Sequence, residues 1–402
     1  WVFRISVTLR KRINAELAQK ALDSVIERFP YFKVRQRPGF FWHYLESNPN
    51  RLMLQAEGPS PCRFLPDECS NGYLLRVQAY KRRISVEFFH ALTDGAGGLH
   101  FLKSLVACYL QLTGLPVGSW EDLLDPQDDP NPEESEDAYR RYLSEDAPKP
   151  MRQDRAFRLP FPIRSTFRYS YLTGECCASD VQNLAQGLGV SVTEYLSGIY
   201  LYVLQCIHSD LPRSLERGCR KTLRLEVPVD LRKHYPTKSM RNFTLFVTPG
   251  FDMRLGWHSF QDVVKLVHHY MRTEVDSRRL NQQLARNVKP AHNIFVRGLP
   301  LLFKKGLLLW SYNAFGPSHY SGVLTNLGKV SMPESIANEI EAFTFVPSPG
   351  RELRIHGAVA TFGQSMRITF GNVTDIRELE RRFFGFLVQA GVHVKIRRYK
   401  DI

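Results

Sequence analysis

The sequence VEFFHALTDGAGGLHFL, residues 86–102, joins an apolar run to a histidine, an Asp-Gly pair and a second apolar rhythm. The residues before His90 alternate between apolar and polar types, as in a strand. Thr93 and Asp94 are helix-capping residues, and Gly95 favours a turn. Apolar residues then return at helical spacing, at Leu99, Leu102, Val106 and Tyr109. This pattern predicts a strand, a turn that carries His90, and an amphipathic helix.

Strands and helices also alternate on both sides of this stretch. WVFRISVTL, residues 1–9, has the alternation of a half-buried strand, and a helix capped by Asn14 follows it. In the second half, strands are expected at 166–174, 222–229, 322–327 and 355–370, with helices between them. One of these helices is expected to run from Ser259 to about Leu284. The order predicts a mixed α/β fold.

An acidic, proline-containing segment separates the two halves of the chain. Seven of the thirteen residues from Asp125 to Asp137 are acidic, and such a segment has little to bury. We interpret residues 125–160 as an exposed linker rather than an interaction tail. The predicted units are therefore an N-terminal subdomain, 1–162, and a C-terminal subdomain, 163–402.

The chain of 402 residues has ordinary globular composition but a formal net charge of +14. A basic balance fits nucleic acid, an anionic membrane surface or a phosphorylated small molecule. The Lys and Arg residues occur as scattered doublets and triplets, without a basic repeat, zinc-finger spacing or an aromatic RNA-binding box. This distribution favours a solvated basic surface over a nucleic-acid site.

The number of cysteines, their spacing and the hydropathy of the chain indicate the cellular compartment in which the protein is expected. The seven cysteines form no Cys-x-x-Cys pair, and their odd number argues against a disulfide framework. The most apolar window, Gly298 to Trp310, is interrupted by Lys304 and Lys305 and is too short to span a bilayer. We therefore expect a cytoplasmic protein without an integral membrane segment.

His90 is the candidate catalytic residue on chemical grounds. An imidazole titrates near neutral pH, with an ordinary pKa of about 6.5, so it can accept a proton from a substrate and return it. The bare backbone at Gly95, Gly97 and Gly98 could let a ligand approach closely. The alternative is a histidine that simply ends an apolar strand, with no chemical role.

The spacing of the candidate residues argues against several other kinds of site. His268 and His269 lack a further metal ligand at helical spacing, and Cys176 and Cys177 have no adjacent base. The run GAGG does not have the spacing of a dinucleotide-binding loop, and no nucleophile elbow of the form GxSxG occurs.

The motif HxxxDG, His90 to Gly95, resembles the active-site segment of the CoA-dependent acyltransferase superfamily. This superfamily includes chloramphenicol acetyltransferase and the condensation domains of peptide synthetases. The sequence is most similar to bacterial alcohol acetyltransferase-like proteins. The resemblance runs over nearly the whole chain, through the ordered segments FRISVTL, RFPYFKVR, NGYLLRV, VEFFHALTDG, VPVDLRKHYPTKSMRNFTLFV, LTNLGKV and FGQSMRITFGN.

The resemblance implies two chloramphenicol acetyltransferase-like subdomains, with mixed sheets, flanking helices and an active-site tunnel between them. It implies that His90 is the general base, and that Asp94 supports the site through a salt bridge, for which Arg232 is the expected partner. Gly95 is expected to let the turn close. Thr325 and Asn326 become candidate oxyanion or acceptor contacts, with a turn that ends a strand as their alternative role.

The implied reaction is transfer of an acyl group, acetyl in the first instance, from acyl-CoA to a small-molecule alcohol without a metal. The three phosphate groups of CoA would give the basic surface a purpose. Phe89 stands where condensation domains usually have a second histidine, which favours a hydroxyl acceptor over an amine. Two alternatives stay open: a carrier-protein thioester as donor to a lipid or polyketide hydroxyl, and a non-catalytic binding protein.

Overall fold

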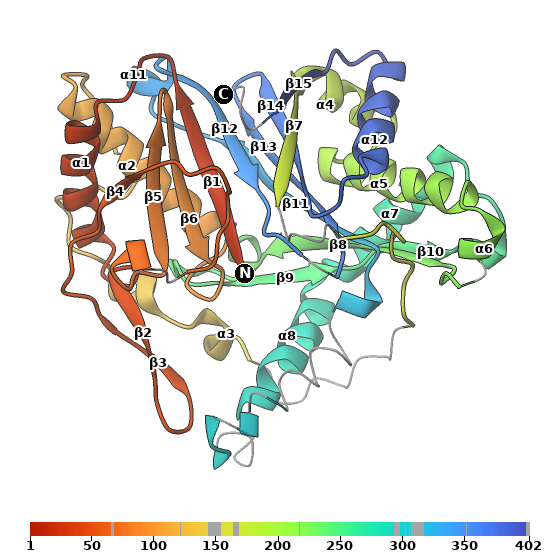
Figure 1. The fold of residues 1–402 in the computed structure, drawn as a ribbon, viewed down its shortest axis with the longest axis horizontal. Helices are drawn as coiled ribbons and strands as arrows, with labels where there is room; N and C mark the ends of the chain where they lie inside the picture. The colour runs from red at the N-terminus through yellow and green to blue at the C-terminus, as the bar shows by residue number, and fades with distance from the viewer. Residues whose placement is uncertain are drawn as a thin grey trace.

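In the computed structural model, two large β-sheets lie side by side and each is flanked by helices (Figure 1). The structure describes residues 1–65, 68–120, 122–143, 154–163, 169–216, 218–292, 298–301, 303, 304, 306, 317–350 and 352–398. The predicted mixed α/β class with two subdomains is confirmed. The predicted boundary between Pro162 and Ile163 stays a prediction.

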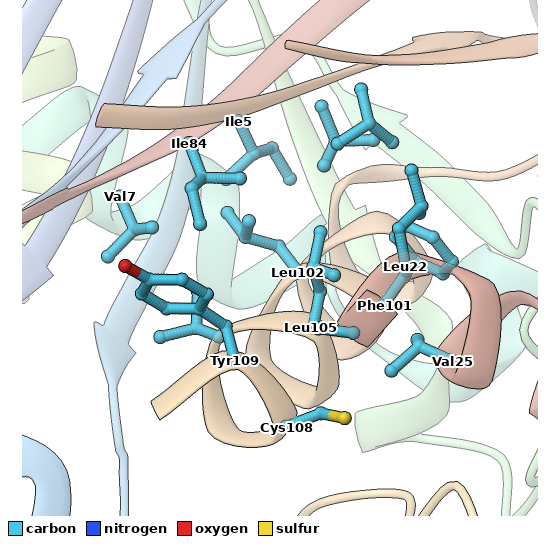
Figure 2. Packing of buried hydrophobic residues seen from close by; sticks show 14 of the residues in the cluster. Ile5, Val7, Leu22, Val25, Ile84, Phe101, Leu102, Leu105, Cys108 and Tyr109 are labelled. Carbon is cyan, nitrogen blue, oxygen red and sulfur yellow. The ribbon is translucent and has the colours of Figure 1, made fainter. Parts of the chain in front are cut away.

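The first sheet has the strand order β12-β1-β6-β5-β4. Its strands are β1 (Val2–Leu9), β4 (Leu54–Ala56), β5 (Leu75–Tyr80), β6 (Arg83–Phe89) and β12 (Ile340–Val346). Two helices pack on one face, α1 (Ala15–Arg28) and α2 (Gly95–Leu112). Figure 2 shows this core, in which Ile5, Val7 and Ile84 of the sheet face Leu22 of α1 and Leu102 and Leu105 of α2.

The expectation that β1 is half-buried is wrong, because all eight of its residues are buried. Arg4 on the polar face is fully buried and is paired with Glu87 and Glu57. Thr8 on the same face accepts a hydrogen bond from Arg367 of β14 (Ser365–Asn372) at 3.3 Å. The second subdomain therefore covers the face that the sequence pattern assigned to solvent.

The second sheet follows the order β10-β8-β11-β13-β14-β7-β15, and β9 also pairs with β8. Its other strands are β7 (Ser170–Cys177), β8 (Thr222–Asp230), β9 (Thr244–Val247), β10 (Gly250–Asp252), β11 (Gly322–Val330), β13 (Ile355–Phe362) and β15 (Lys395–Arg398). β8, β11 and β13 run parallel to one another, whereas the pairs on either side are antiparallel. The sheet is mixed, as predicted.

The main helices of the second subdomain are α4 (Ala178–Gly187), α5 (Val192–Ser209), α7 (Phe260–Glu274), α8 (Ser277–His292) and α12 (Glu378–Gln389). The single helix expected from Ser259 to about Leu284 is divided into α7 and α8. Asp276 explains the division, because its carboxylate accepts the backbone N–H of Arg278 at 2.9 Å and so caps a new helix.

The shorter elements lie at the edges of this arrangement. Among the described residues they are the hairpin β2 (Val34–Pro38) and β3 (His43–Ser47), the one-turn helices α3 (Ala138–Arg141), α6 (Arg213–Glu216) and α11 (Glu334–Ala337), and five 3₁₀ turns. The turn Leu231–Lys233 directly after β8 is the one that concerns the site.

The acidic segment is partly integrated into the fold. Glu134 is buried, and its carboxylate accepts two hydrogen bonds from Arg28, at 2.7 and 2.8 Å, and one from Tyr31. The expectation of an exposed linker over 125–160 is therefore wrong at Glu134, where charge pairing replaces apolar burial. It is also wrong at Phe157 and Leu159, which lie in the apolar core of the second subdomain. The part of the predicted linker from 144 to 153 lies outside the described residues.

Within the described residues, no single helix is long and apolar enough to cross a membrane. The helices α4 and α5 pass a test of length and composition only as a pair, and they are bent by 82° relative to each other. Six of the thirteen residues of the apolar window Gly298 to Trp310 lie outside the described residues: 302, 305 and 307–310.

Candidate active site

His90 lies directly after the last residue of β6, in the turn that leads into α2. Its backbone N–H donates to the carbonyl of Trp1 at 2.8 Å, which continues the pairing of β6 with β1. The imidazole lies edge-on to the ring of Phe3, with 5.1 Å between the ring centroids. The two neighbouring strands thus hold both the backbone and the ring of His90.

The environment keeps the His90 ring neutral. Burial lowers the pKa of His90 below its ordinary value, against the opposing effects of a hydrogen bond to its own backbone carbonyl and of the charge on Asp94. Only Nδ1 can reach the carbonyl of its own residue, so this bond leaves the proton on Nδ1 and a lone pair on Nε2. The ring therefore has an unprotonated nitrogen available at neutral pH.

Asp94 is turned towards the backbone of α2 and towards the second subdomain. Its Oδ1 caps α2 by accepting the N–H groups of Ala96 and Gly97, at 3.1 and 3.0 Å. Its Oδ2 accepts from Arg232 Nη1 at 2.9 Å, from the Phe243 N–H at 2.7 Å and from Thr244 Oγ1 at 3.1 Å. Burial alone would raise the pKa of Asp94, but Arg232 and these donors lower it overall.

The ion pair expected between Asp94 and Arg232 is therefore present in the structure. Arg232 lies in the 3₁₀ turn after β8, and its guanidinium also donates to the carbonyls of Ser239 and Arg241 and to Asp230. The side chain of Asp94 is 3% exposed and that of Arg232 is 14% exposed. The pair joins the turn that carries His90 to the second subdomain.

The glycines after His90 serve close packing of the protein on itself. A Cβ on Gly97 would lie 2.4 Å from the carbonyl oxygen of Met240, and one on Gly98 would lie 3.0 Å from the Phe88 ring. The expectation of room for a ligand is therefore wrong at these two positions, because protein atoms occupy the space. Gly95 lines the cavity described below, and a Cβ there would lie 2.7 Å from Leu327 Cδ2.

Thr325 and Asn326 lie on β11, where the strand approaches the turn carrying His90. Asn326 has the structural contacts of a turn: its Nδ2 donates to Thr193 Oγ1 at 3.0 Å, and its Oδ1 accepts the N–H of Gly328 at 2.8 Å. The Thr325 hydroxyl makes no hydrogen bond within the described part of the chain. Both residues line the same cavity as His90.

The cavity has a volume of about 810 Å³ and is lined by residues of both subdomains. The N-terminal subdomain contributes Phe3, His90, Asp94, Gly95, Leu99 and His100, and the C-terminal subdomain contributes residues from β8, β9, β11, β12 and β13. A volume of this size is ordinary for a small-molecule site. The structure thus brings His90, Asp94, Gly95, Thr325 and Asn326 to one cavity, with Arg232 directly behind Asp94.

Three titratable residues of the cavity were missed by the sequence analysis. Burial raises the pKa of Glu226 to about 7, and burial lowers the pKa values of His100 and His356 to about 4. One signal for Glu226 was available, since an acid within the apolar strand LRLEVPV is unusual. Among the described residues, no group of three or more His, Cys, Asp and Glu side chains could hold a metal ion.

No protein-family model and no curated protein matches the sequence. Among solved structures, the chain has the fold of the CoA-dependent acyltransferases and condensation domains. This likeness, at 10 to 15% identity in the cases that follow, concerns the fold.

Two of the matched structures align with this chain over almost the whole length of both chains. One is TRI101 of F. sporotrichioides, solved with coenzyme A and T-2, with 11% identity, a TM-score of 0.62, and coverage of 98% of this chain and 96% of that one. Another is the condensation domain of the monacolin K polyketide synthase MokA, with 10% identity, a TM-score of 0.60, and coverage of 97% and 91%.

A third is the nonribosomal peptide synthetase FmoA3, solved with AMPPNP, with 15% identity and a TM-score of 0.58. The match covers 97% of this chain but 40% of the synthetase, so the chain spans well under half the length of that protein.

Proposed function

We propose that this protein transfers an acyl group from a thioester to a hydroxyl group, with His90 as the general base. The observation that carries the proposal is the position of the His90 ring, which is half-buried, packs edge-on against Phe3 and lines a cavity formed by residues of both subdomains. Its surroundings lower its pKa, which favours the unprotonated ring. A general base needs an unprotonated nitrogen within reach of the substrate, and this arrangement supplies one.

In the proposed reaction, Nε2 of His90 removes the proton from the acceptor hydroxyl as its oxygen attacks the thioester carbonyl carbon. The tetrahedral intermediate then collapses, and its carbon–sulfur bond breaks. The leaving thiolate takes the proton from the imidazolium, so the products are an ester and a free thiol. A positioned base of this kind contributes about 10²- to 10⁴-fold to the rate.

Thr325 is the proposed donor to the oxyanion of the intermediate. Its hydroxyl lines the cavity and has no partner among the described residues, so it is available to donate. Asn326 is the weaker candidate, because one of its two amide hydrogens is already bonded to Thr193 and its oxygen holds the Gly328 N–H.

The proposed donor is acyl-CoA, acetyl-CoA in the first instance. The net charge of +14 is favourable for a substrate with three phosphate groups. The structure of TRI101 with coenzyme A shows that this fold can hold the molecule in that protein. A carrier-bound thioester is the second candidate, supported by the likeness to part of a peptide synthetase.

The test measures thiol release from acetyl-CoA, and from acetyl-N-acetylcysteamine as a small stand-in for a carrier-bound thioester, with a panel of primary and secondary alcohols. We expect the His90→Ala variant to lose about 10²- to 10⁴-fold in kcat, because the hydroxyl loses its base. Its melting temperature should stay close to that of the unchanged protein.

The matched control is His269→Ala, which removes an exposed histidine from α7. It should retain full activity. The proposal is overturned if no alcohol is acylated from either thioester, in which case the fold serves binding alone. Substantial activity in His90→Ala would show that another group removes the proton.

A further inference from the structure

Three neighbouring strands of the second sheet place Glu226, Val323 and His356 in one row across the cavity wall. Val323 of β11 is in register with Glu226 of β8 on one side and with His356 of β13 on the other. All three residues line the cavity. Because adjacent strands are about 4.8 Å apart, the backbones of Glu226 and His356 are separated by about 10 Å.

Within the part of the chain that the structure describes, Glu226 has no partner in this row or beyond it. Among the described residues, no hydrogen bond or ion pair reaches its carboxyl group, and burial raises its pKa to about 7. Arg224 is the nearest cation along the same face of β8, but its guanidinium donates to the backbone carbonyls of Asp154 and His319. Glu226 is half-buried in the cavity wall, so its carboxyl group is open to a ligand in the cavity.

His356 cannot supply the missing donor. Its pKa is lowered to about 4 by burial, so the ring is neutral, and a hydrogen bond to the backbone carbonyl of Ser348 uses its one N–H group. Its Nε2 is therefore an acceptor, and this atom is buried without a partner. The Glu226 carboxylate and His356 Nε2 are both hydrogen-bond acceptors. Within the described residues, neither of them is bonded to a donor.

We propose that Glu226 binds a hydrogen-bond donor on the acceptor substrate, separate from the hydroxyl that is acylated. The acceptor would then be an alcohol that carries a second hydroxyl or a protonated amine, and not a simple alkanol. The inference rests on the proposed acyl transfer, because it assigns the substrate class of the same cavity. An unpaired acceptor in a wall discriminates well, since a ligand without the donor leaves it unpaired.

The first test compares acceptors that differ in one group. Straight-chain alkanols of four to ten carbons are measured against the diols and amino alcohols of the same length, with acetyl-CoA as donor. At a matching length we expect about 10- to 100-fold higher kcat/KM for an acceptor with the second donor. The diol and amine arms show which donor the wall prefers.

The Glu226→Leu variant should bring the ratio of the two kcat/KM values close to one. Glu216→Gln, which removes the charge of a surface carboxylate of α6 that pairs with Lys221, is the control and should leave the ratio unchanged. Equal kcat/KM values for all three acceptor classes, or an unchanged ratio in Glu226→Leu, would overturn the inference. So would a complete loss of alkanol turnover in that variant, which would make Glu226 catalytic.

A second readout does not depend on turnover. The preferred diol or amino alcohol should raise the melting temperature of the unchanged protein without any thioester, and this shift should be lost in Glu226→Leu. If no alcohol is acylated but the shift occurs, the acyltransferase proposal fails and the donor-binding site stands. If alkanols are acylated and no shift occurs, the acyltransferase proposal stands and the donor-binding site fails.

A third measurement separates a binding role from a structural one. Glu226→Gln at pH 8 should make the free protein more stable, because it removes an unpaired carboxylate whose surroundings disfavour the charge. The folded-state pKa of about 7 lies above the ordinary 4.5, so the unchanged protein should lose stability as the pH rises through that interval, and the variant should not. Destabilisation by Glu226→Gln at pH 8 would mean that the carboxylate has a structural partner.

Discussion

His90 and Asp94 stand four residues apart in one short turn, yet their surroundings give them opposite ionisation states. Burial lowers the pKa of His90, so its ring is neutral, whereas Arg232 and two backbone N–H groups keep Asp94 ionised. In the described structure, the hydrogen bonds to the Asp94 carboxylate come from the backbone of α2 and from the second subdomain. The carboxylate therefore positions the turn, and the imidazole is left to act on a substrate.

The state of His90 leads to a prediction about pH. Because the free base must be unprotonated, kcat/KM should be level near neutral pH and fall on acidification, with an apparent pKa below the ordinary 6.5. Initial rates between pH 4.5 and 8, on protein shown to remain folded, give this profile. Glu226 also titrates in this range, so Glu226→Gln is the control, and the fall below pH 6.5 should persist in it. A midpoint above 6.5 would contradict the assignment of His90.

Residues of the site differ in how far the sequence could reveal them. His90, Asp94 and Arg232 lie in the short segments HxxxDG and VPVDLR, and the resemblance of these segments to a known family implied their roles. Glu226 and His356 are 130 positions apart, and only the parallel register of β8, β11 and β13 brings them together. Strand register depends on long-range pairing that no local pattern encodes, so this row could not have been predicted.

At the scale of elements, the start of α2 and the turn after β8 form one connected unit. Asp94 caps α2 and binds Arg232, while the Thr93 hydroxyl donates to the carbonyl of Met240 at 2.7 Å. Both links join the two subdomains beside His90. The position of the base therefore depends on an element that lies about 140 residues further along the chain.

The Arg232→Ala variant should lower the free energy of unfolding by about 3 to 5 kcal/mol, because it leaves the buried Asp94 carboxylate without its cation. Loss of alignment at His90 should also lower kcat by about 10²-fold. Chemical denaturation and steady-state kinetics measure the two effects. Arg381→Ala, which removes an exposed arginine of α12 in an ion pair with Glu378, is the matched control and should change neither.

Asp94→Asn separates positioning from stability within the same unit. Asp94 raises the pKa of His90 through its charge, so its removal should move the acid limb of the pH profile to lower pH. A purely structural carboxylate would leave that limb in place. If Arg232→Ala proved as stable and as active as the Arg381→Ala control, the pair would have no supporting role.

Element boundaries were predictable where a cap lies in the sequence, and less so where partners are distant. Asn14 caps α1 as expected, and Asp94, one of the two capping residues expected for α2, caps that helix. The division between α7 and α8 depends on Asp276, a capping residue inside a continuous apolar stripe. The second buried face of β1 was missed because its polar residues find partners on other strands, as Arg4 does with Glu87.

At the scale of the whole molecule, the two subdomains are not independent in sequence. β12, from the second half of the chain, completes the first sheet by pairing antiparallel with β1. The core of the first subdomain includes three side chains of β12: Ile340, Phe343 and Phe345. Burial of side chains of this size contributes roughly 1.5 to 3 kcal/mol each. Their sum is comparable with the total stability of a typical domain.

We therefore predict that residues 1–162 alone do not form a stable fold, because β1 becomes an open edge and the core loses these side chains. A fusion of residues 333–347 to Trp1 through a short Gly-Ser loop should fold cooperatively. The connection is feasible because Val346 pairs with Arg4, so that end of β12 lies beside the start of β1. Thermal unfolding followed by circular dichroism compares the two proteins. A cooperative transition in the unfused fragment, at the same temperature as in the fusion, would show that β12 does not stabilise the first subdomain. The predicted division at residue 162 would then separate two units that fold independently.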